Sequence, residues 1–275
     1  MQLPVRDPRF IAGALVLSAL TLIALGADIL YPGDPQQLVA QPLLSPGADA
    51  AYPLGTDILG RDVAAGLAHG ARTTLAVGAV STLFALLVGV LIGVLSGYFG
   101  GWVDDLLGRL TELFQTVPSI ILVIALTVIV GPSISSMMIA IGAVSWPPIA
   151  RLARGEVLAL REREFIQACR SVGMTEARII VHHVMPNISA PIVVTISIVV
   201  ATSILIESGL SFLGLGDPNI VSWGGMIGAG REMIRTEWQL TAIPGIAIMV
   251  TVLALNFLAE ALSEGADPRL LLGRT

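Results

Sequence analysis

The sequence contains no lysine, so all fifteen of its basic residues are arginines. A P-loop binds nucleotide phosphates partly through a lysine that follows its glycine-rich turn. Because that lysine is missing, the chain is not expected to hydrolyse ATP through a P-loop. If ATP drives its activity, another chain must carry out the hydrolysis.

Cysteine and histidine are also scarce, with one cysteine, Cys169, and three histidines. A single cysteine excludes a disulfide within the chain and disfavours a cysteine-ligated metal site. His182 and His183 are neighbours, so on a helix they point about 100° apart and would chelate a metal poorly. Ser211 lies in a GLSFL segment, which lacks the second glycine of a nucleophile elbow. We therefore predict no metal site and no catalytic residue.

Charged residues make up only 13% of the chain and aromatic residues 5%, whereas 55% is hydrophobic. Soluble domains carry about 25% charged residues, so this composition indicates a membrane protein. The 29 glycines suit helices that pack closely in lipid. Gly89, Gly93 and Gly97 recur every four residues, and we expect them to mark such a contact rather than a ligand pocket.

The long apolar runs predict an all-α membrane protein with six transmembrane helices, because roughly 20 helical residues cross a bilayer. Four of the spans are expected within residues 10–30, 73–103, 190–210 and 240–262, the second ending near Tyr98. The first run is expected to be retained rather than removed as a signal peptide, because no clean cleavage site follows it. A polar loop, residues 31–71, separates the first two spans.

The uncharged run at residues 113–150 is too long for one span. A Gly-Pro-Ser turn at residues 131–133 divides it, since proline breaks a helix and glycine permits the turn. We expect two spans joined by a tight outer turn, with kinks or helix ends at Pro118, Pro147 and Pro148.

Six spans place both termini on one side of the membrane, and the arginines indicate that this side is the cytoplasm. With the N-terminus inside, four of the fifteen arginines lie in outer segments: Arg61, Arg72, Arg231 and Arg235. The other eleven are then cytoplasmic, as the positive-inside rule requires.

The longest charged segment, residues 161–187, lies between the fourth and fifth expected spans. It predicts two short helices joined at Gly173, which suits a helix end, with Pro186 closing the second helix. The apolar face of the first helix follows helical spacing: Phe165, Ala168, Cys169 and Val172. The pattern alone fits either a docking element gripped by another protein or an amphipathic loop on the membrane surface. The flanking spans disfavour a DNA-reading helix-turn-helix, so no nucleic-acid partner is expected.

This segment resembles the EAA motif of ABC importer permeases, which runs Glu-Ala-Ala-x3-Gly-x9-Ile-x-Leu-Pro. Ala168, Gly173 and Pro186 match the motif at its spacing. The sequence departs from the motif at four positions: Gln167 for Glu, Cys169 for the second Ala, His183 for Ile and Met185 for Leu. The glutamine removes a charge that the family motif carries.

Further stretches resemble the second permease of dipeptide, oligopeptide and nickel importers, in the same order along the chain. They are PLGTDILGRD at residues 53–62, ESGLSFLGLG at 207–216, SWG at 222–224 and ADPR at 266–269. Together with the EAA-like segment they extend over nearly the whole chain, which makes the resemblance far more specific than the EAA match alone.

The resemblance implies a type I ABC importer (MetI-like) permease fold in a bacterial inner membrane. Residues 1–71 would hold the N-terminal tail, first span and outer loop, residues 72–263 the permease domain, and residues 264–275 a cytoplasmic tail. The implied partners are membrane lipid, a homologous permease, two ABC ATPase subunits and an extracytoplasmic substrate-binding protein. ATP and magnesium would bind to the ATPases, and no cofactor to this chain.

In such importers the EAA segment couples the permease to the ATPase, and this chain would form half of a pathway for peptides. The coupling residues implied here are Phe165, Gln167, Ala168, Cys169, Arg170, Gly173 and Pro186. We expect the Phe165 face to be buried and the face with Gln167 and Arg170 to contact the ATPase. The rival interpretation is an ATP-independent secondary transporter or channel, and a membrane enzyme comes third.

Glu207 is an acid inside the fifth expected span, and a charge at the bilayer centre costs on the order of 3 kcal/mol of insertion free energy. Counted from Asn187, its helix extends about 30 Å, which places the carboxyl near the outer rim. We expect a structural pairing with Arg231, Arg235 or the backbone amides of the following turn, in preference to a role in an outer gate.

Overall fold

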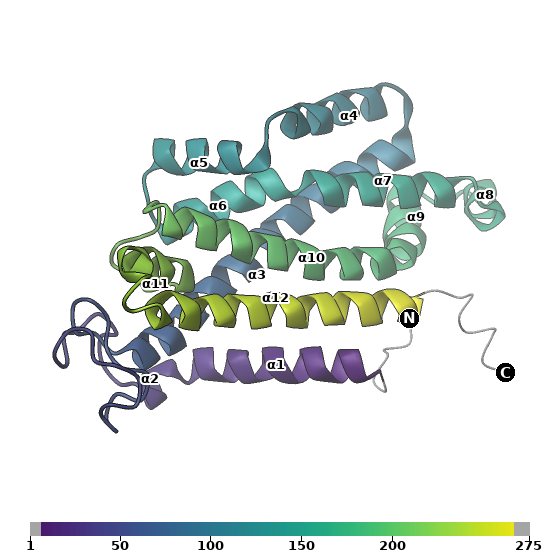
Figure 1. Ribbon diagram of the computed structural model, residues 1–275. Coiled ribbons are helices and arrows are strands. Elements are labelled where there is room, and N and C mark those ends of the chain that lie inside the picture. The colour runs from purple at the N-terminus through teal and green to yellow at the C-terminus, as the bar shows by residue number, and fades with distance from the viewer. Residues whose placement is uncertain (1–6, 267–275) are drawn as a thin grey trace.

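The computed structural model describes residues 7–266, and the regular elements in that range are all helices (Figure 1). Five helical stretches are long and apolar enough to cross a membrane: α1 (Pro8–Leu25), α3 (Val63–Phe99), α6 with α7 (Ile134–Arg161), α9 through α10 (Glu176–Phe212) and α12 (Gln239–Ala266). They pack into one bundle, so the expected all-α membrane fold is confirmed.

A sixth span is present if the helices α4 (Gly101–Thr116) and α5 (Ser119–Val130) are counted together, although a bend of 86° separates them. Pro118 lies at the bend, where it has no amide hydrogen to extend the hydrogen-bond ladder of α4. The expected number of six spans is therefore reached through a bent pair of helices rather than a straight third span.

The expected turn between the third and fourth spans lies at Gly131, whose φ of +103° favours glycine. It joins α5 to α6 (Ile134–Ser145). Only Trp146, with a helical backbone, separates α6 from α7 (Pro147–Arg161). The two prolines that begin α7 therefore stand at a helix start, where proline is tolerated, and they do not end the span.

The first span is shorter than expected, because Gly26 ends α1 and a single turn, α2 (Ala27–Leu30), follows it. Residues 31–62 then form a loop that contains no helix. This loop is held by backbone hydrogen bonds of its own, such as that from the Val39 amide to the Gly60 carbonyl at 2.9 Å. The polar loop predicted from the sequence is thus ordered, although it is shorter than predicted.

α3 begins at Val63, which corrects the start expected near residue 73. Asp62 caps its first turn by accepting a backbone hydrogen bond at 2.8 Å. Arg72 lies inside the helix and donates to the Asp28 carboxylate at 2.8 Å. That hydrogen bond lowers the pKa of Asp28 below its usual value. An arginine whose charge is paired can therefore lie inside a helix without ending it. As a result, the domain boundary expected at residue 72 lies inside α3.

α3 is the central helix, and its glycines let α7 cross it closely. A Cβ atom at Gly93 would lie 2.7 Å from the Cβ of Ala153, and one at Gly97 would lie 2.8 Å from the Arg154 carbonyl oxygen. Gly89 meets the start of α7 in the same way. Real Cβ atoms do not approach so closely, so the expected role of these glycines in helix packing is confirmed.

The bundle has two different ends (Figure 1). The hairpin at residues 164–184 projects from one of them, beside the start of α1 and the end of α12. These two helices are joined there by the ion pair of Arg9 and Glu264 at 3.0 Å. We call this the hairpin end. The opposite loop end holds residues 31–62 and the short helix α11 (Trp223–Gly230).

Part of the sequence-based topology falls outside the described residues. Arg6, Arg269 and Arg274 lie there, as do residues 267–269 of the ADPR ending and most of the expected tail at 264–275.

Candidate functional site

The charged segment folds as a hairpin of two short helices, α8 (Glu164–Ser171) and α9 (Glu176–Ile179). Gly173 turns the chain between them with a φ of +76°, and its amide donates to the Arg170 carbonyl at 2.9 Å. A Cβ atom at Gly173 would meet nothing within 4 Å. Glycine is therefore favoured here by the backbone conformation, not by lack of space.

One face of the hairpin is buried against the membrane helices. Ile166 of α8 and Ile179 of α9 are fully buried and pack in one cluster with Tyr98, Val157 and Ile188. These contacts join the hairpin to α3, α7 and α10. Each Å² of apolar surface that is buried stabilises the packed arrangement by about 25 cal/mol. These contacts therefore hold the hairpin in a fixed position.

The expected burial of the Phe165 face is wrong. Phe165 remains 42% exposed and Val172 79% exposed, whereas Ile166 carries the buried contact. Two apolar stripes one residue apart share α8, and helical spacing alone does not decide which of them meets the core. Gln167 lies on the exposed face, as expected.

Arg170 turns toward the bundle, in contrast to the outward orientation expected for it. Its guanidinium carbon lies 5.2 Å from the centre of the Tyr98 ring. Its Nε atom lies 3.7 Å from the Glu176 carboxylate. The exposed surface of α8 is therefore formed by Phe165, Gln167 and their neighbours, with Arg170 behind them.

Pro186 does not close the hairpin, which corrects another expectation. The chain passes from α9 through a π-helix, η1 (Ile180–Val184), into α10 (Met185–Phe212) without a break. The Met185 amide donates to the Ile180 carbonyl in the wider π pattern. Pro186 stands where the π pattern changes to the α pattern, and the missing amide hydrogen of the proline falls at this change of hydrogen bonding. The hairpin is thus continuous with a membrane helix.

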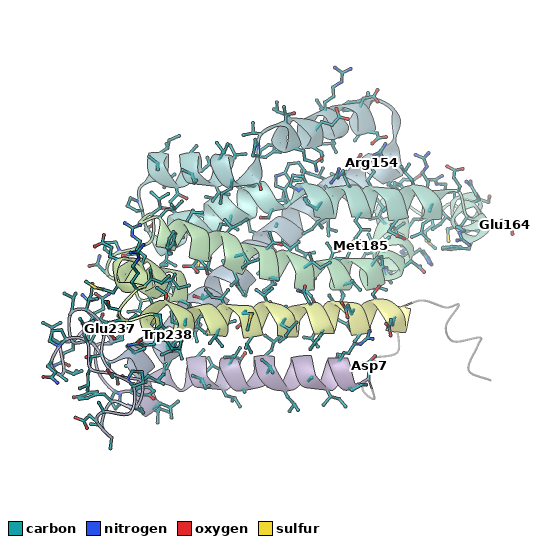
Figure 2. All side chains as sticks on the ribbon, in the orientation of Figure 1. Asp7, Arg154, Glu164, Met185, Glu237 and Trp238 are labelled. Carbon is teal, nitrogen blue, oxygen red and sulfur yellow. The ribbon has the colours of Figure 1, made fainter. Side chains whose placement is uncertain are left out.

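A charged pair that sequence reasoning missed lies near the hairpin end. Arg154 of α7, which Figure 2 labels, donates to both carboxylate oxygens of Asp104 on α4, at 2.5 and 2.7 Å. Ser96 of α3 donates to Asp104 as well. The pair lines a polar cavity of about 480 Å³ between these three helices. The two partners are 50 positions apart in sequence, and neither stands out locally, so no sequence signal joined them.

Glu207 is fully buried in α10 near the loop end. Its carboxyl accepts hydrogen bonds from Ser211 at 2.7 Å and Ser208 at 3.3 Å. None of the expected pairings, with Arg231, Arg235 or backbone amides of the following turn, is present among residues 7–266. Arg231 is exposed and donates to the Phe212 carbonyl at 3.4 Å, and Arg235 forms no ion pair within residues 7–266. The hydroxyls of Ser208 and Ser211, on the same helix, are its hydrogen-bond partners instead.

α11 covers the Glu207 region at the loop end. A Cβ atom at Gly224 would lie 2.5 Å from the Cα of Ser208, so α11 approaches α10 at backbone distance. Trp223 is buried and its indole donates to the Leu67 carbonyl of α3 at 2.9 Å. Figure 2 places Glu237 and Trp238, at the start of α12, on this same side, far from Glu164 of the hairpin.

Several known proteins are similar to this chain. Residues 89–272 match the family described as binding-protein-dependent transport system inner membrane component. The dipeptide transport system permease protein DppC of Alkalihalophilus pseudofirmus is 37% identical over 94% of this chain and 86% of its own. The glutathione transport system permease protein GsiD of Pectobacterium atrosepticum is 34% identical over 94% and 87%.

The fold is also known from solved structures. A chain of the inward-facing methionine ABC transporter MetNI has a TM-score of 0.61 over 73% of this chain and 96% of its own, with 21% identity. This likeness confirms the fold expected from the sequence, that of a type I ABC importer permease.

Proposed function

Because the chain belongs to the family of binding-protein-dependent transport system inner membrane components, we propose that it is a permease subunit of an ATP-driven importer of short peptides. It is a multi-pass inner membrane protein, with five long apolar helices and a bent pair that can form a sixth span. In this proposal it forms half of the translocation pathway and carries out no catalysis.

The hairpin is the observation that carries the proposal. It is fixed to three membrane helices by buried residues such as Ile166 and Ile179, and it leaves Phe165, Gln167 and Val172 exposed at the end of the bundle. An ATPase that grips this exposed surface moves the membrane helices with it, because the hairpin is continuous with α10. Its match to the EAA motif at Ala168, Gly173 and Pro186 supports this role.

ATP and magnesium are then bound by separate ATPase subunits, and this chain holds no cofactor. The absence of lysine from the whole sequence supports this division of labour. Two ATPase subunits and a homologous permease complete the membrane complex, since the surface of α8 offers one docking site for each permease.

The hairpin end is cytoplasmic in this proposal, together with the start of α1 and the end of α12. The positive-inside rule supports this orientation, because, of the arginines within residues 7–266, only Arg61, Arg72, Arg231 and Arg235 belong to the loop end. The binding protein named in the family description would then deliver substrate from outside and dock at the loop end. A cavity of about 280 Å³ lies there between residues 31–62 and α11.

Peptides are the cargo that the relatives favour. DppC of Pseudomonas aeruginosa, which is 35% identical, is described as a di/tripeptide permease. Dipeptides, tripeptides and glutathione are all short peptides with a free carboxylate and amine. We therefore propose this chemical class for the present chain, without choosing a member of it.

The test is uptake by proteoliposomes that contain this chain, its partner permease and the ATPase subunits. A binding protein loaded with labelled dipeptide is supplied outside, and accumulated label is measured with ATP or a non-hydrolysable analogue inside. We expect accumulation only with ATP. Equal accumulation with the analogue, or by vesicles that lack the ATPase, would support an ATP-independent transporter instead.

A further inference from the structure

Three side chains join both arms of the hairpin to the end of α3, and we call them the Tyr98 cluster. The Tyr98 hydroxyl donates a hydrogen bond to the Glu176 carboxylate of α9. Arg170 of α8 lies 3.7 Å from the same carboxylate and 5.2 Å from the Tyr98 ring centre. The cluster therefore gathers one residue each from α3, α8 and α9 at a single point.

Tyr98 is held firmly at this point. It is only 3% exposed, and it packs in the buried cluster that contains Ile166 and Ile179 of the hairpin. From α7, the guanidinium of Arg161 donates to the carbonyls of Gly97 at 3.5 Å and Tyr98 at 3.4 Å. A cation suits these carbonyls because they lie at the C-terminal end of a helix, where backbone acceptors are unpaired.

The hairpin has no covalent link to α3. It connects directly to α7 before it and to α10 after it, whereas α3 ends at Phe99, far earlier in the chain. Any displacement of the hairpin reaches α3 either through these neighbours or through contacts such as the Tyr98 cluster. The cluster is a direct polar route beside the apolar packing of Ile166 and Ile179 against Tyr98, and it links both hairpin arms to one side chain of α3.

α3 also reaches the loop end, where it meets the elements near Glu207. Its Leu67 carbonyl accepts from the Trp223 indole at 2.9 Å, and its Thr74 hydroxyl accepts from the Trp223 amide at 3.3 Å. At 1.5 Å per residue, its 37 residues span roughly 55 Å. A pull on its hairpin end is thus transmitted along one continuous helix.

We propose that the Tyr98 cluster transmits movement of the hairpin to α3, so that Tyr98, Arg170 and Glu176 are positioning residues for coupled transport. This inference rests on the proposed function, because it assumes that an ATPase moves the hairpin. It goes further by naming the route inside the permease, which the exposed docking surface does not determine. Without the cluster, ATP hydrolysis would continue while α3 would respond poorly.

The experiment compares Tyr98→Phe and Glu176→Gln with the wild type in the complete complex in proteoliposomes. Subunit co-purification, ATP hydrolysis and peptide uptake are measured together. Hydrogen bonds to charged groups are strong enough that their loss changes an equilibrium about tenfold or more. We expect both variants to assemble and to hydrolyse ATP near the wild-type rate, while uptake per ATP falls roughly tenfold.

The matched control is Glu156→Gln on α7, which makes the same change at a carboxylate without hydrogen bond or ion pair among residues 7–266. It should leave uptake per ATP unchanged. The exchange Arg170→Glu with Glu176→Arg should recover much of the uptake that the single Glu176→Arg variant loses, because opposite charges again face each other.

Unchanged uptake per ATP in Tyr98→Phe would overturn the inference while the proposed function stands. Loss of the ATPase subunits from that complex would also overturn it, since the cluster would then shape the docking surface. If Tyr98→Phe fails to fold, Glu176→Gln alone decides, because that side chain is 52% exposed. A wild-type complex that accumulates no peptide refutes the proposed function, and the inference falls with it.

Discussion

Gly173 shows how a single residue determines the shape of the hairpin. Its φ of +76° lies in the left-handed region, and no neighbour would contact an added Cβ. The cost of a side chain there is therefore almost purely conformational, about 1–2 kcal/mol. The same reasoning identifies the residue from sequence, because a glycine between two amphipathic helices is the usual signal of such a turn.

Gly173→Ala should therefore loosen the hairpin without blocking membrane insertion. We expect amides of residues 164–184 to exchange hydrogen roughly tenfold faster, as a loss of about 1.4 kcal/mol implies. Hydrogen-exchange mass spectrometry of the purified chain measures this. Gly155→Ala is the control, because Gly155 also has open space but lies inside α7 without a positive φ. Equal protection in both variants would contradict the role given to Gly173.

Glu207 is a second residue whose environment yields a prediction. Glu207→Ala leaves the Ser208 and Ser211 hydroxyls without their buried acceptor, which costs about 1–3 kcal/mol. Glu207→Gln keeps an acceptor oxygen of similar shape and should cost less. Thermal denaturation in detergent checks this order, with Glu232→Ala, at an exposed acid, as the neutral control. If Glu207→Ala has the melting temperature of the wild type, the hydrogen bonds from Ser208 and Ser211 contribute little to stability.

The limits of sequence reasoning are visible in the same residues. That Glu207 would lie near the end of its span was predictable from its position. Its hydrogen-bond partners were not, because serines one and four positions away on the helix compete with distant arginines. Similarly, the spacing of apolar residues predicted the two helices of the hairpin. The same spacing did not show whether Phe165 or Ile166 would be buried in the core. The core face depends on Tyr98 and Val157, which lie far away in the sequence.

At the scale of elements, hydropathy located the spans better than their ends. α3 begins ten residues before its uncharged run, because Arg72 is paired with Asp28. α10 continues back through Pro186 into the hairpin, because a π-helix precedes the proline. In both places a local contact overrides a residue that usually marks a boundary. That α3 packs closely against another helix, in contrast, was predictable from three glycines, although the partner α7 was not.

That crossing gives a prediction for the pair of helices. Gly93→Ala places a Cβ 2.7 Å from the Cβ of Ala153, so α7 must shift away from α3. Such overpacking typically costs about 1–3 kcal/mol, and the melting temperature in detergent should fall. Gly245→Ala in α12 is the control, because a Cβ there meets nothing within 4 Å. That variant should be neutral or slightly stabilised, and a similar loss in both would contradict the packing account.

At the scale of the whole molecule, the two ends of the bundle divide the proposed tasks. The hairpin end offers an exposed apolar and polar surface on α8, and the loop end carries residues 31–62 and α11 over the buried Glu207. The fold and the family were predictable because motifs recur along nearly the whole chain in a known order. How the ends communicate was not predictable, because Tyr98, Arg170 and Glu176 meet only in three dimensions.

The central claim is that α8 docks on a separate ATPase, and site-directed cross-linking tests it most directly. In a Cys169→Ser background, Val172→Cys places a thiol directly after α8, at a position that is 79% exposed. Leu213→Cys, at a residue 57% exposed near the loop end, is the control. With a short thiol-directed photocrosslinker in assembled complexes, we predict that position 172 cross-links to the ATPase subunit and position 213 does not. Absence of that product at position 172, or equal yield from both positions, would contradict the account.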